Sequence, residues 1–341
     1  MSYHIDVQPS GQGFDIEPGE TVLDAGSRQG VVLHHGCKNG LCGSCKGRVL
    51  EGSVSYPDGI PKGLTTEEAE AGTHLFCKTV AESDLRIEAN AVEAVADLEV
   101  RNFPVRVASL EKLSHDVMGV YLQMPKDQLL QFLPGQYIDV LIEDGKRRAF
   151  SIANAPNEHG MLELHIRHVP GGLFTDKVFA TLKEKSILRI RAPLGTFYLR
   201  DDDRPLIMVG GGTGFAPIKG IIEGALTQGC SRPIHFFWGV RSKEDLYMPD
   251  LPAQWANQCS NILFTPVLSE PKDSDQWEGE TGYVHESVVR QYPDLSGHAV
   301  YMGGPPVMIQ ACQNAFFEAG LPKDQIFYDS FDYAAATEVK V

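Results

Sequence analysis

The sequence lacks the features that mark membrane, secreted and nucleic-acid-binding proteins. It has no run of about 18 apolar residues, so we expect no transmembrane helix. Its start, MSYHIDVQPSGQGF, has no basic region followed by an apolar stretch, so we expect no signal peptide. Positive charge is scarce, because 30 Lys and Arg face 45 Asp and Glu, for a net charge of −15. This balance disfavours nucleic acids and anionic membranes as partners and is compatible with docking on a basic protein.

Internal repeats and low-complexity tracts are also missing from the sequence. The 341 residues, 43% of them hydrophobic, are enough for two or three globular domains. From the missing apolar run, the missing signal peptide and the acidic charge balance, we expect a cytoplasmic protein with no membrane or nucleic-acid partner. We also favour a monomer.

Three regions differ in their hydrophobic pattern. Residues 1–92 combine short strand-like stretches with two short helical stretches, which indicates an α+β domain. Residues 100–201 alternate at period two between turns, for example in YIDVLI, LELHIR and ILRIRA, which predicts an antiparallel β-barrel. Residues 204–341 alternate apolar strands with helices, which predicts an α/β domain with a parallel sheet covered on both faces.

Four of the seven cysteines fall in the first region. Cys37, Cys42 and Cys45 lie within nine positions, and 31 residues separate Cys45 from Cys77. The spacing C-x4-C-x2-C…C is typical of plant-type [2Fe–2S] clusters. Glycines surround these cysteines and permit close approach and positive φ angles around a cluster: Gly36, Gly40, Gly43 and Gly47.

Other uses of these cysteines are a disulfide framework, a zinc site or a crowded turn without chemistry. Clustered cysteines in a cytosolic protein bind metal more often than they form disulfides. Zinc sites usually show two C-x2-C-type pairs, whereas the pattern here is three plus one. The iron–sulfur interpretation is favoured, and residues 1–92 resemble a plant-type ferredoxin domain of the β-grasp fold. The other three cysteines are interpreted as small core residues: Cys230, Cys259 and Cys312.

The segment RRAFSIANAP resembles the Arg-x-Tyr-Ser signature of the ferredoxin reductase superfamily. By that resemblance Arg148 binds the flavin phosphate, Phe150 stacks on the isoalloxazine, and Ser151 lies near flavin N5 and is the candidate catalytic residue. Arginine suits phosphate because its guanidinium forms paired hydrogen bonds. Phe150 departs from the usual Tyr, so it can stack on the flavin but has no hydroxyl to donate.

A second flavin-binding element of the same family is matched by HIRHVPGGLFT. The resemblance implies cofactor contacts by His165, Ile166, Arg167, Gly172 and Thr175, with the pyrophosphate held at the start of a helix. APLGTFYL matches the Pro-x-Gly-x-Phe that closes the barrel. Reductases with an N-terminal ferredoxin domain use FAD, so FAD is expected rather than FMN.

The segment MVGGGTGFAPIKG reads as a strand, a glycine turn and a helix. Such a turn lets backbone amides approach a pyrophosphate, although Phe215 stands where a full G-x-G-x-x-G fingerprint has glycine. The segment matches the superfamily's Gly-Gly-Gly-Thr-Gly motif, which implies nicotinamide-cofactor contacts by Gly212, Thr213 and Gly214.

Two further segments belong to the same expected site. WGVRSKEDLY matches the segment near the adenosine ribose, where Arg241 is the expected contact. Ser242 and Lys243 could help Arg241 to hold a 2′-phosphate, whereas Glu244 and Asp245 would repel one, and the resemblance favours NADH over NADPH. VYMGGPPVMI matches the nicotinamide loop, with Gly303 in place of the usual Cys, and implies backbone roles for Gly303, Gly304 and Pro305. Phe331 matches the family's terminal aromatic, which shields the flavin, or else it is simply packed.

The resemblance covers nearly the whole chain, in the order ferredoxin, FAD barrel, NAD domain. It implies an NADH-dependent oxidoreductase that passes electrons through FAD and a [2Fe–2S] cluster to a partner protein, either an oxygenase or a sugar 3-dehydratase component. One alternative is a reductase of free flavin or small acceptors, and another is a non-enzymatic, redox-responsive binding subunit. Four intact cysteines argue against the first alternative, and the flavin and nicotinamide motifs argue against the second.

Overall fold

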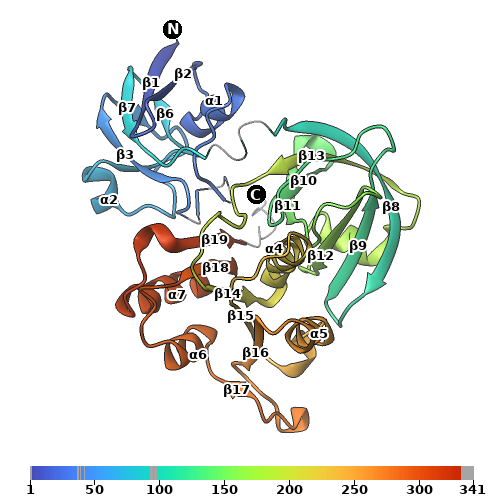
Figure 1. Cartoon of the computed structure of the whole chain (residues 1–341). Helices are drawn as coiled ribbons and strands as arrows, with labels where there is room; N and C mark the ends of the chain where they lie inside the picture. Colours follow the sequence, from blue (N-terminus) through green and yellow to red (C-terminus); the bar gives the residue numbers. More distant parts are fainter. Residues whose placement is uncertain are drawn as a thin grey trace. The chain divides into compact units, whose positions relative to one another are not determined.

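The computed structural model describes residues 2–36, 38, 40–41, 43–92, 95 and 98–331. It forms two compact units, Met1–Glu99 and Val100–Val341 (Figure 1). Two of the four predicted cluster ligands, Cys37 and Cys42, lie outside the described residues.

The N-terminal unit is built on a five-stranded sheet with the order β2-β1-β7-β3-β5. The first two strands form the antiparallel hairpin that the sequence predicts, and β1 also pairs in parallel with β7. A separate pair of very short strands, β4 and β6, completes the unit. The strands are β1 Tyr3–Gln8, β2 Gln12–Ile16, β3 Lys46–Glu51, β4 Val54–Ser55, β5 Thr73–Leu75, β6 Val80–Ala81 and β7 Leu85–Glu88.

Two short helices accompany this sheet, α1 (Val22–Arg28) and α2 (Thr66–Glu70). The Thr21 side chain caps α1. At α2, Thr65 and Glu68 form a reciprocal capping box, which satisfies two backbone amides that a helix start otherwise leaves unbonded. The mixed sheet and capped helices confirm the predicted α+β architecture.

The second unit begins with an antiparallel six-stranded sheet of the order β11-β10-β13-β8-β9-β12. An isolated bridge between Ile152 and Leu164 brings its two edges together, so the sheet curls into the predicted barrel. Alternate side chains of the strands fill the interior, and a short helix, α3 (Thr175–Ala180), packs Val178 into the same core. The strands are β8 Arg101–Lys112, β9 Val117–Gln123, β10 Tyr137–Leu141, β11 Arg147–Ser151, β12 Met161–Arg167 and β13 Ile187–Leu194.

The remainder of the second unit is the predicted parallel sheet, with the order β17-β16-β15-β14-β18-β19. Chain order reverses direction at β14, so the crevice beyond the carboxyl ends of β14 and its neighbours is where such folds bind ligands. The strands are β14 Leu206–Gly211, β15 Ile234–Val240, β16 Ile262–Leu268, β17 Glu280–Thr281, β18 Ala299–Gly304 and β19 Ile326–Ser330.

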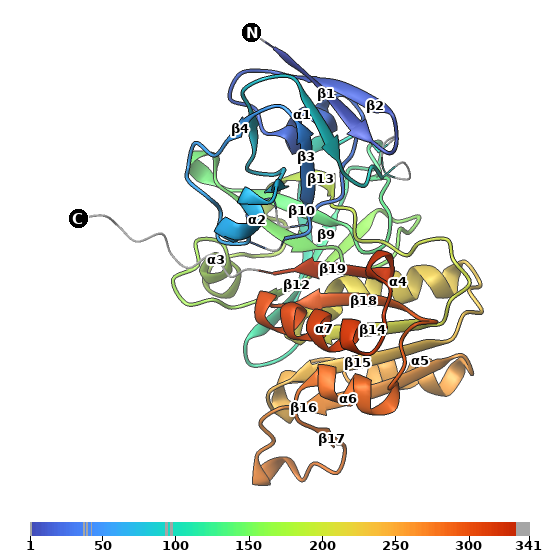
Figure 2. The same ribbon diagram turned by 90° about the vertical axis from the view of Figure 1, so that its left-hand side faces the viewer.

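Helices cover both faces of this parallel sheet (Figure 2). One face packs against α4 and α5 through side chains such as Ile218 and Trp255. The other packs against α6 and α7 through side chains such as Val288 and Phe316. The helices are α4 Phe215–Thr227, α5 Asp250–Gln258, α6 Val284–Gln291 and α7 Pro306–Glu318. No helix in the described part of the chain is long and apolar enough to cross a membrane.

The cysteines outside the predicted cluster site belong to this second unit. Cys312 on α7 is completely buried, and Cys230 and Cys259 are half-buried against the core. None of the three forms a disulfide. Their interpretation as packing residues is consistent with these positions.

A buried histidine in β15 makes the stability of the second unit depend on pH. His235 bonds to the hydroxyls of Tyr292 and Thr265, at 2.8 Å each, and burial lowers its pKa to about 4. Below about pH 6.5 the unfolded chain therefore binds a proton that the folded chain does not, so the free energy of unfolding falls as the pH falls. We expect a loss of about 2 kcal/mol between pH 7 and pH 5 from this residue.

Urea unfolding followed by tryptophan fluorescence measures this loss, since all three tryptophans lie in the second unit. His235→Gln should remove that part of the pH dependence, whereas His159→Gln, at an exposed histidine, should leave it unchanged. An unchanged slope in His235→Gln would contradict the assignment.

Candidate functional site

The two described cysteines of the predicted cluster site lie on adjoining backbone. The Phe76 amide donates to the Cys45 carbonyl at 3.1 Å, and Cys45 and Cys77 are each 5% exposed. Neither forms a disulfide. In the loop before them Gly40 and Gly43 have φ angles of +80° and +79°, a region that favours glycine. Two cysteines on adjoining backbone, next to a loop with glycines at positive φ, fit an iron–sulfur cluster.

Gly47 has a different role from the one predicted, because its φ angle is not in the positive region. At Gly47 an added Cβ would lie 2.2 Å from the ring of Phe76, so this glycine makes room for an aromatic side chain of the core rather than for sulfur. Lys38, which is not a glycine, adopts a positive φ of 56° instead.

The predicted flavin motif lies on β11, at the edge of the barrel. Arg148 and Phe150 point to one side of the strand and are half-buried, and the Phe150 ring lies 5.5 Å from that of Phe174 in the loop before α3. Ser151 is buried and donates to Asp329 of β19 at 3.1 Å. The motif therefore touches the second predicted flavin element on one side and the parallel sheet on the other.

The second flavin element occupies the end of β12 and the following loop. The side chains of His165 and Ile166 are buried, so only their backbone is available to an outside ligand. The Arg167 guanidinium lies 3.1 Å from Asp116, yet its Nε and Nη2 are buried and make no hydrogen bond among the described residues. The same two nitrogens face the carboxylates of Asp116 and Asp245, so contact of Arg167 with an anionic cofactor remains a prediction.

In the loop after β12, the Thr175 hydroxyl is already engaged. It donates to the Val169 carbonyl at 2.9 Å and accepts from the Val169 amide at 3.2 Å. An added Cβ at Gly172 would lie 2.3 Å from that hydroxyl, so Gly172 permits this closed loop. Thr175 thus shapes the loop, and contact with a pyrophosphate through its hydroxyl remains a prediction.

The glycine turn after β14 is a 3-10 turn, η3 (Gly212–Gly214), that leads into α4. Gly212 has a φ of +53°, and the Trp238 indole donates to its carbonyl at 3.0 Å. An added Cβ at Gly214 would lie 1.9 Å from the Gly303 carbonyl oxygen, so two glycine segments pack backbone against backbone. The turn is rigidly placed at the carboxyl end of the sheet, where a pyrophosphate would meet its amides.

The predicted nicotinamide loop lies at the end of the neighbouring strand, β18. Gly303 faces the glycine turn, and a Cβ there would lie 2.6 Å from the Gly214 carbonyl oxygen. Gly304 accepts from the Phe331 amide at 2.9 Å, and Pro305 is the residue before α7. The replacement of the family's Cys by Gly303 therefore coincides with unusually close packing of the two loops.

The predicted ribose contact, Arg241, is exposed just beyond the carboxyl end of β15. The next residues form a 3-10 turn, η4 (Lys243–Asp245). The Arg167 guanidinium of the barrel approaches Asp245 of this turn at 3.9 Å. Contacts between barrel and parallel sheet thus join elements of the two predicted sites, through Ser151 and Asp329 and through Arg167 and Asp245.

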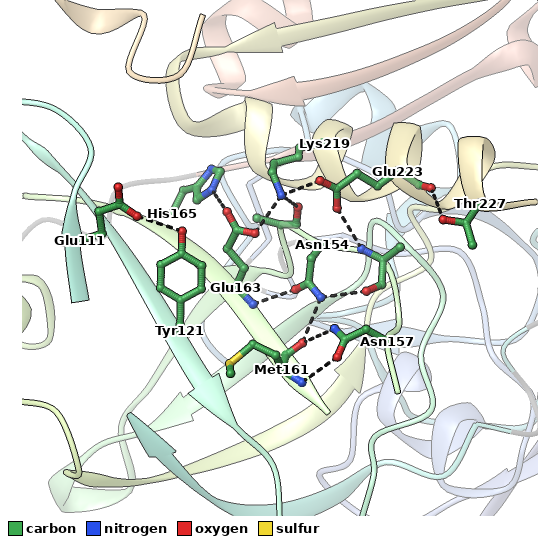
Figure 3. Close-up of polar contacts among 12 residues, drawn as sticks. Glu111, Tyr121, Asn154, Asn157, Met161, Glu163, His165, Lys219, Glu223 and Thr227 are labelled. Atoms are coloured by element: carbon green, nitrogen blue, oxygen red, sulfur yellow. Dashed lines mark hydrogen bonds and ion pairs between the residues drawn. The ribbon is translucent and has the colours of Figure 1, made fainter. Parts of the chain in front are cut away.

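A buried polar network, which the motif analysis missed, joins the barrel to the parallel sheet (Figure 3). Lys219 of α4, 5% exposed, lies 2.8 Å from both Glu163 of β12 and Glu223, one helical turn further along α4. Glu163 also bonds to His165 at 2.8 Å, and the other ring nitrogen of His165 bonds to Tyr247 at 2.9 Å. Lys219 is five residues after Gly214, so the network holds the glycine turn against the predicted flavin strand.

Charge states in this network follow from its partners. Burial raises the pKa of Glu163, but the His165 hydrogen bond and the Lys219 charge outweigh it, so the pKa lies below the ordinary value. Burial holds the pKa of His165 below its ordinary value. The network therefore consists of an ionised Glu163, a charged Lys219 and a neutral His165 that donates to Glu163 and accepts from Tyr247.

Removing the cation of this network should destabilise the second unit strongly. Lys219→Met keeps the length of the side chain but leaves Glu163 buried without its counter-charge, and we expect a loss of about 3 kcal/mol in the free energy of unfolding. Urea unfolding measures it. The double variant Lys219→Met with Glu163→Gln should recover part of the loss, because it also removes the unpaired charge. A loss below about 1 kcal/mol in the single variant would contradict this account.

Sequence signals for the missed residues were weak but present. Lys219 interrupts an apolar helical stretch and has Glu223 four residues later, an ion-pair spacing on a helix. Glu163, Tyr247 and Asp329 have no local signal, because their partners lie far away along the chain.

Comparison with known proteins identifies three domains in this order. Residues 5–82 match the 2Fe-2S iron-sulfur cluster binding domain, 104–198 the oxidoreductase FAD-binding domain, and 208–314 the oxidoreductase NAD-binding domain. The chain is 37% identical over 331 residues to the CDP-6-deoxy-L-threo-D-glycero-4-hexulose-3-dehydrase reductase of Yersinia pestis, covering 97% of this chain and 99% of that one.

Other relatives belong to oxygenase systems. Identity to the phenol hydroxylase P5 protein of Acinetobacter pittii is 36% over 340 residues, covering 98% of this chain and 96% of the relative. Among solved structures, the Amycolatopsis cytochrome P450 reductase GcoB superposes with a TM-score of 0.80 at 32% identity, covering 98% of this chain and 100% of GcoB. The FAD, NAD and [2Fe–2S] cofactors predicted from the motifs are confirmed by these domain matches.

With three cofactor domains in one chain and full-length relatives of the same layout, the protein belongs to the family of iron–sulfur flavoprotein reductases, oxidoreductases that carry electrons from NADH through FAD and a [2Fe–2S] cluster.

Proposed function

We propose that this reductase delivers single electrons to a protein acceptor, which is an oxygenase or a sugar 3-dehydratase component. One observation carries the proposal: the cluster domain shares a chain with FAD and NAD domains, and this chain aligns over almost its whole length with relatives named as a hexulose-3-dehydrase reductase and as the reductase component of a phenol 2-monooxygenase. When bound, FAD accepts a hydride from NADH and the cluster carries one electron at a time.

The residues of this chain would supply binding, orientation and exclusion of water. We assign Arg148 and Arg167 to the charged part of FAD, since both lie at the barrel edge and Arg167 has unbonded donors. We assign Phe150 to the flavin ring. Ser151 would lie near flavin N5, where Asp329 fixes the direction of its hydroxyl at 3.1 Å.

On the nicotinamide side, we assign the pyrophosphate to the amides of the turn at 212–214 and the nicotinamide to the backbone of 303–305. Support comes from their common position at the carboxyl ends of adjacent strands, β14 and β18, of a parallel sheet. Arg241 would meet the adenosine ribose beyond β15. Cys37 and Cys42 would complete the ligand set of Cys45 and Cys77.

We also propose the domain limits 1–92, 100–201 and 204–341, a monomeric state and a cytoplasmic location.

Reconstitution tests the proposed acceptor class. The holoprotein and NADH are combined with a purified diiron hydroxylase, a ring-hydroxylating oxygenase or a hexulose 3-dehydrase, and product is measured. Product formation that disappears when the cluster is removed supports the proposal. Failure with every protein acceptor, combined with fast reduction of free FMN by cluster-free protein, would overturn it in favour of a small-acceptor reductase.

We expect the preference for NADH over NADPH to depend on two acidic residues of this chain that interact with lysines beside the predicted ribose segment. Lys272 lies 2.5 Å from Glu244, and the Lys243 ammonium donates to the Asp275 carbonyl while its backbone amide donates to the Asp275 carboxylate. We expect Glu244→Gln combined with Asp275→Asn to raise kcat/KM for NADPH about tenfold at low salt, because the pair of substitutions removes the carboxylate bonded to Lys272 and a second negative charge near both lysines that would repel a 2′-phosphate.

The measurement is steady-state reduction of ferricyanide with each nucleotide. In the double variant, kcat/KM for NADH should stay within about twofold of the value for the unmodified protein. Glu184→Gln, at an exposed acid of the barrel, is the control and should change neither value. A double variant that uses NADPH no better than the control would show that these lysines do not decide the preference.

A further inference from the structure

Positive charge in the N-terminal unit is concentrated around the cluster loop. Residues 1–99 contain 16 Asp and Glu but only seven Lys and Arg. Three segments, 31–50, 59–66 and 71–81, hold five of those seven cations and none of the acids. All four lysines of the unit fall in these segments, and we call them the lysine face: Lys38, Lys46, Lys62 and Lys78.

The fold brings these three segments together around the cysteine loop. The Gly63 amide donates to the Gly40 carbonyl at 2.9 Å, which ties the second segment to the first. An added Cβ at Gly40 would lie 3.0 Å from Lys78 Cγ, which places the third segment beside the same loop. Strand β5, inside the third segment, pairs with β3 through Lys46 and Leu75. The lysines therefore share one end of the unit with Cys45.

The members of the lysine face differ in how far carboxylates neutralise them. Lys38 lies 3.6 Å from Asp24, and Lys46 lies 2.6 Å from Glu68. Lys62 is exposed and Lys78 is half-buried, and neither forms an ion pair with any carboxylate that the structure describes. These two charges remain available to a partner.

Asp24 and Glu68 neutralise two of the five cations, so three remain beside a [2Fe–2S] cluster that, with four thiolates, carries about two negative charges. The cations thus offset the cluster charge at this end of the unit, on a chain whose net charge is −15. Net charge alone predicts a basic partner, but docking depends on the charge near the contact, because a Debye length is only about 10 Å at 0.1 M salt.

We propose that the lysine face is the docking surface for the electron acceptor and that the acceptor presents carboxylates around its own redox centre. This inference rests on the proposed function, since it concerns the exit of electrons at the cluster. An acidic face on the acceptor would align with Lys62 and Lys78, whereas the acids on the rest of the unit would repel it and so orient the encounter.

Two protein probes of opposite charge test the proposal with the full-length holoprotein: cytochrome b5, which has carboxylates around its haem edge, and cytochrome c, which has lysines there. NADH-driven reduction of each is measured at about 20 mM and 200 mM salt. The rate that remains in the Cys77→Ser variant is subtracted from each measured rate, so that only cluster-dependent reduction is compared. Binding of ferric cytochrome b5 to the oxidised holoprotein is measured separately by calorimetry.

Lys62→Gln combined with Lys78→Gln should lower kcat/KM for cytochrome b5 about tenfold at low salt and weaken its binding by a similar factor. Cytochrome c reduction should not fall. The control is Arg86→Gln combined with Lys183→Gln, two exposed cations outside the lysine face. It makes the same change in net charge and should leave the reduction of both cytochromes unchanged.

Three results would overturn the inference. The first is that the lysine pair and the control pair behave alike. The second is that the lysine double variant reduces both cytochromes more slowly by the same factor and has a lower cluster reduction potential, because the lysines would then act on the cluster and not on docking. The third is that the unmodified protein binds and reduces cytochrome c but not cytochrome b5. If NADH drives no Cys77-dependent reduction of either probe, the proposed function itself fails.

Discussion

Cys77→Ser is expected to reduce NADH-driven cytochrome c reduction by at least about 100-fold while leaving reduction of the flavin by NADH within about twofold of the unmodified protein. Cys77 is 5% exposed, and its neighbour Phe76 is bonded to the Cys45 backbone, so loss of its sulfur removes one of two ligands at a place built for both. The flavin and nicotinamide elements lie in the other compact unit, which the substitution does not touch.

The measurements are iron content, cytochrome c reduction and anaerobic bleaching of the flavin by NADH. Cys230→Ser is the matched control, because Cys230 is a half-buried cysteine outside the cluster domain and should behave as the unmodified protein does. Full cytochrome c reduction by a Cys77→Ser protein without cluster iron would show that electrons leave from the flavin and that the cluster is not on the path.

Gly214→Ala is expected to lower the rate of flavin reduction by NADH about 100-fold or more. A Cβ at this position would lie 1.9 Å from the Gly303 carbonyl oxygen, so the backbone of one glycine segment must move away from the other. Displacement of reacting groups by about 1 Å costs on the order of 100-fold in rate. Both the pyrophosphate turn and the nicotinamide loop are shifted by this one methyl group.

Stopped-flow mixing with NADH measures the rate, and the FAD content shows whether the barrel is intact. Gly297→Ala is the control, since it precedes β18 and an added Cβ there meets nothing within 4 Å. Gly214→Ala protein that keeps its FAD and is reduced at an unchanged rate would place the nicotinamide site elsewhere.

Motifs with local chemistry were predictable from the sequence. The Arg-x-Phe-Ser strand and the glycine turn each need residues that are adjacent along the chain, and the structure places them on β11 and on η3. The alternation of β10, β12 and β13 predicted a barrel, because residues that alternate between interior and exterior repeat every second position.

Contacts between distant segments could not be predicted in this way. Ser151 and Asp329 are 178 positions apart, and Glu163 and Lys219 are 56 apart, so no window of sequence contains both partners. Gly47 was misinterpreted for the same reason, because the ring that requires its small size belongs to Phe76, in the turn after β5. The lysine face likewise emerges only when β3, β5 and the loop at Gly63 are brought together.

The central claim is that electrons reach the cluster through the flavin, and anaerobic mixing of the holoprotein with one equivalent of NADH tests it most directly. Flavin absorbance and the electron paramagnetic resonance signal of the reduced cluster are followed in time. We predict that flavin bleaching comes first, at a rate that rises with NADH concentration, and that the cluster signal follows and disappears in Cys77→Ser. A cluster that stays oxidised while the flavin is fully reduced, or a cluster signal that precedes flavin bleaching, would contradict the account.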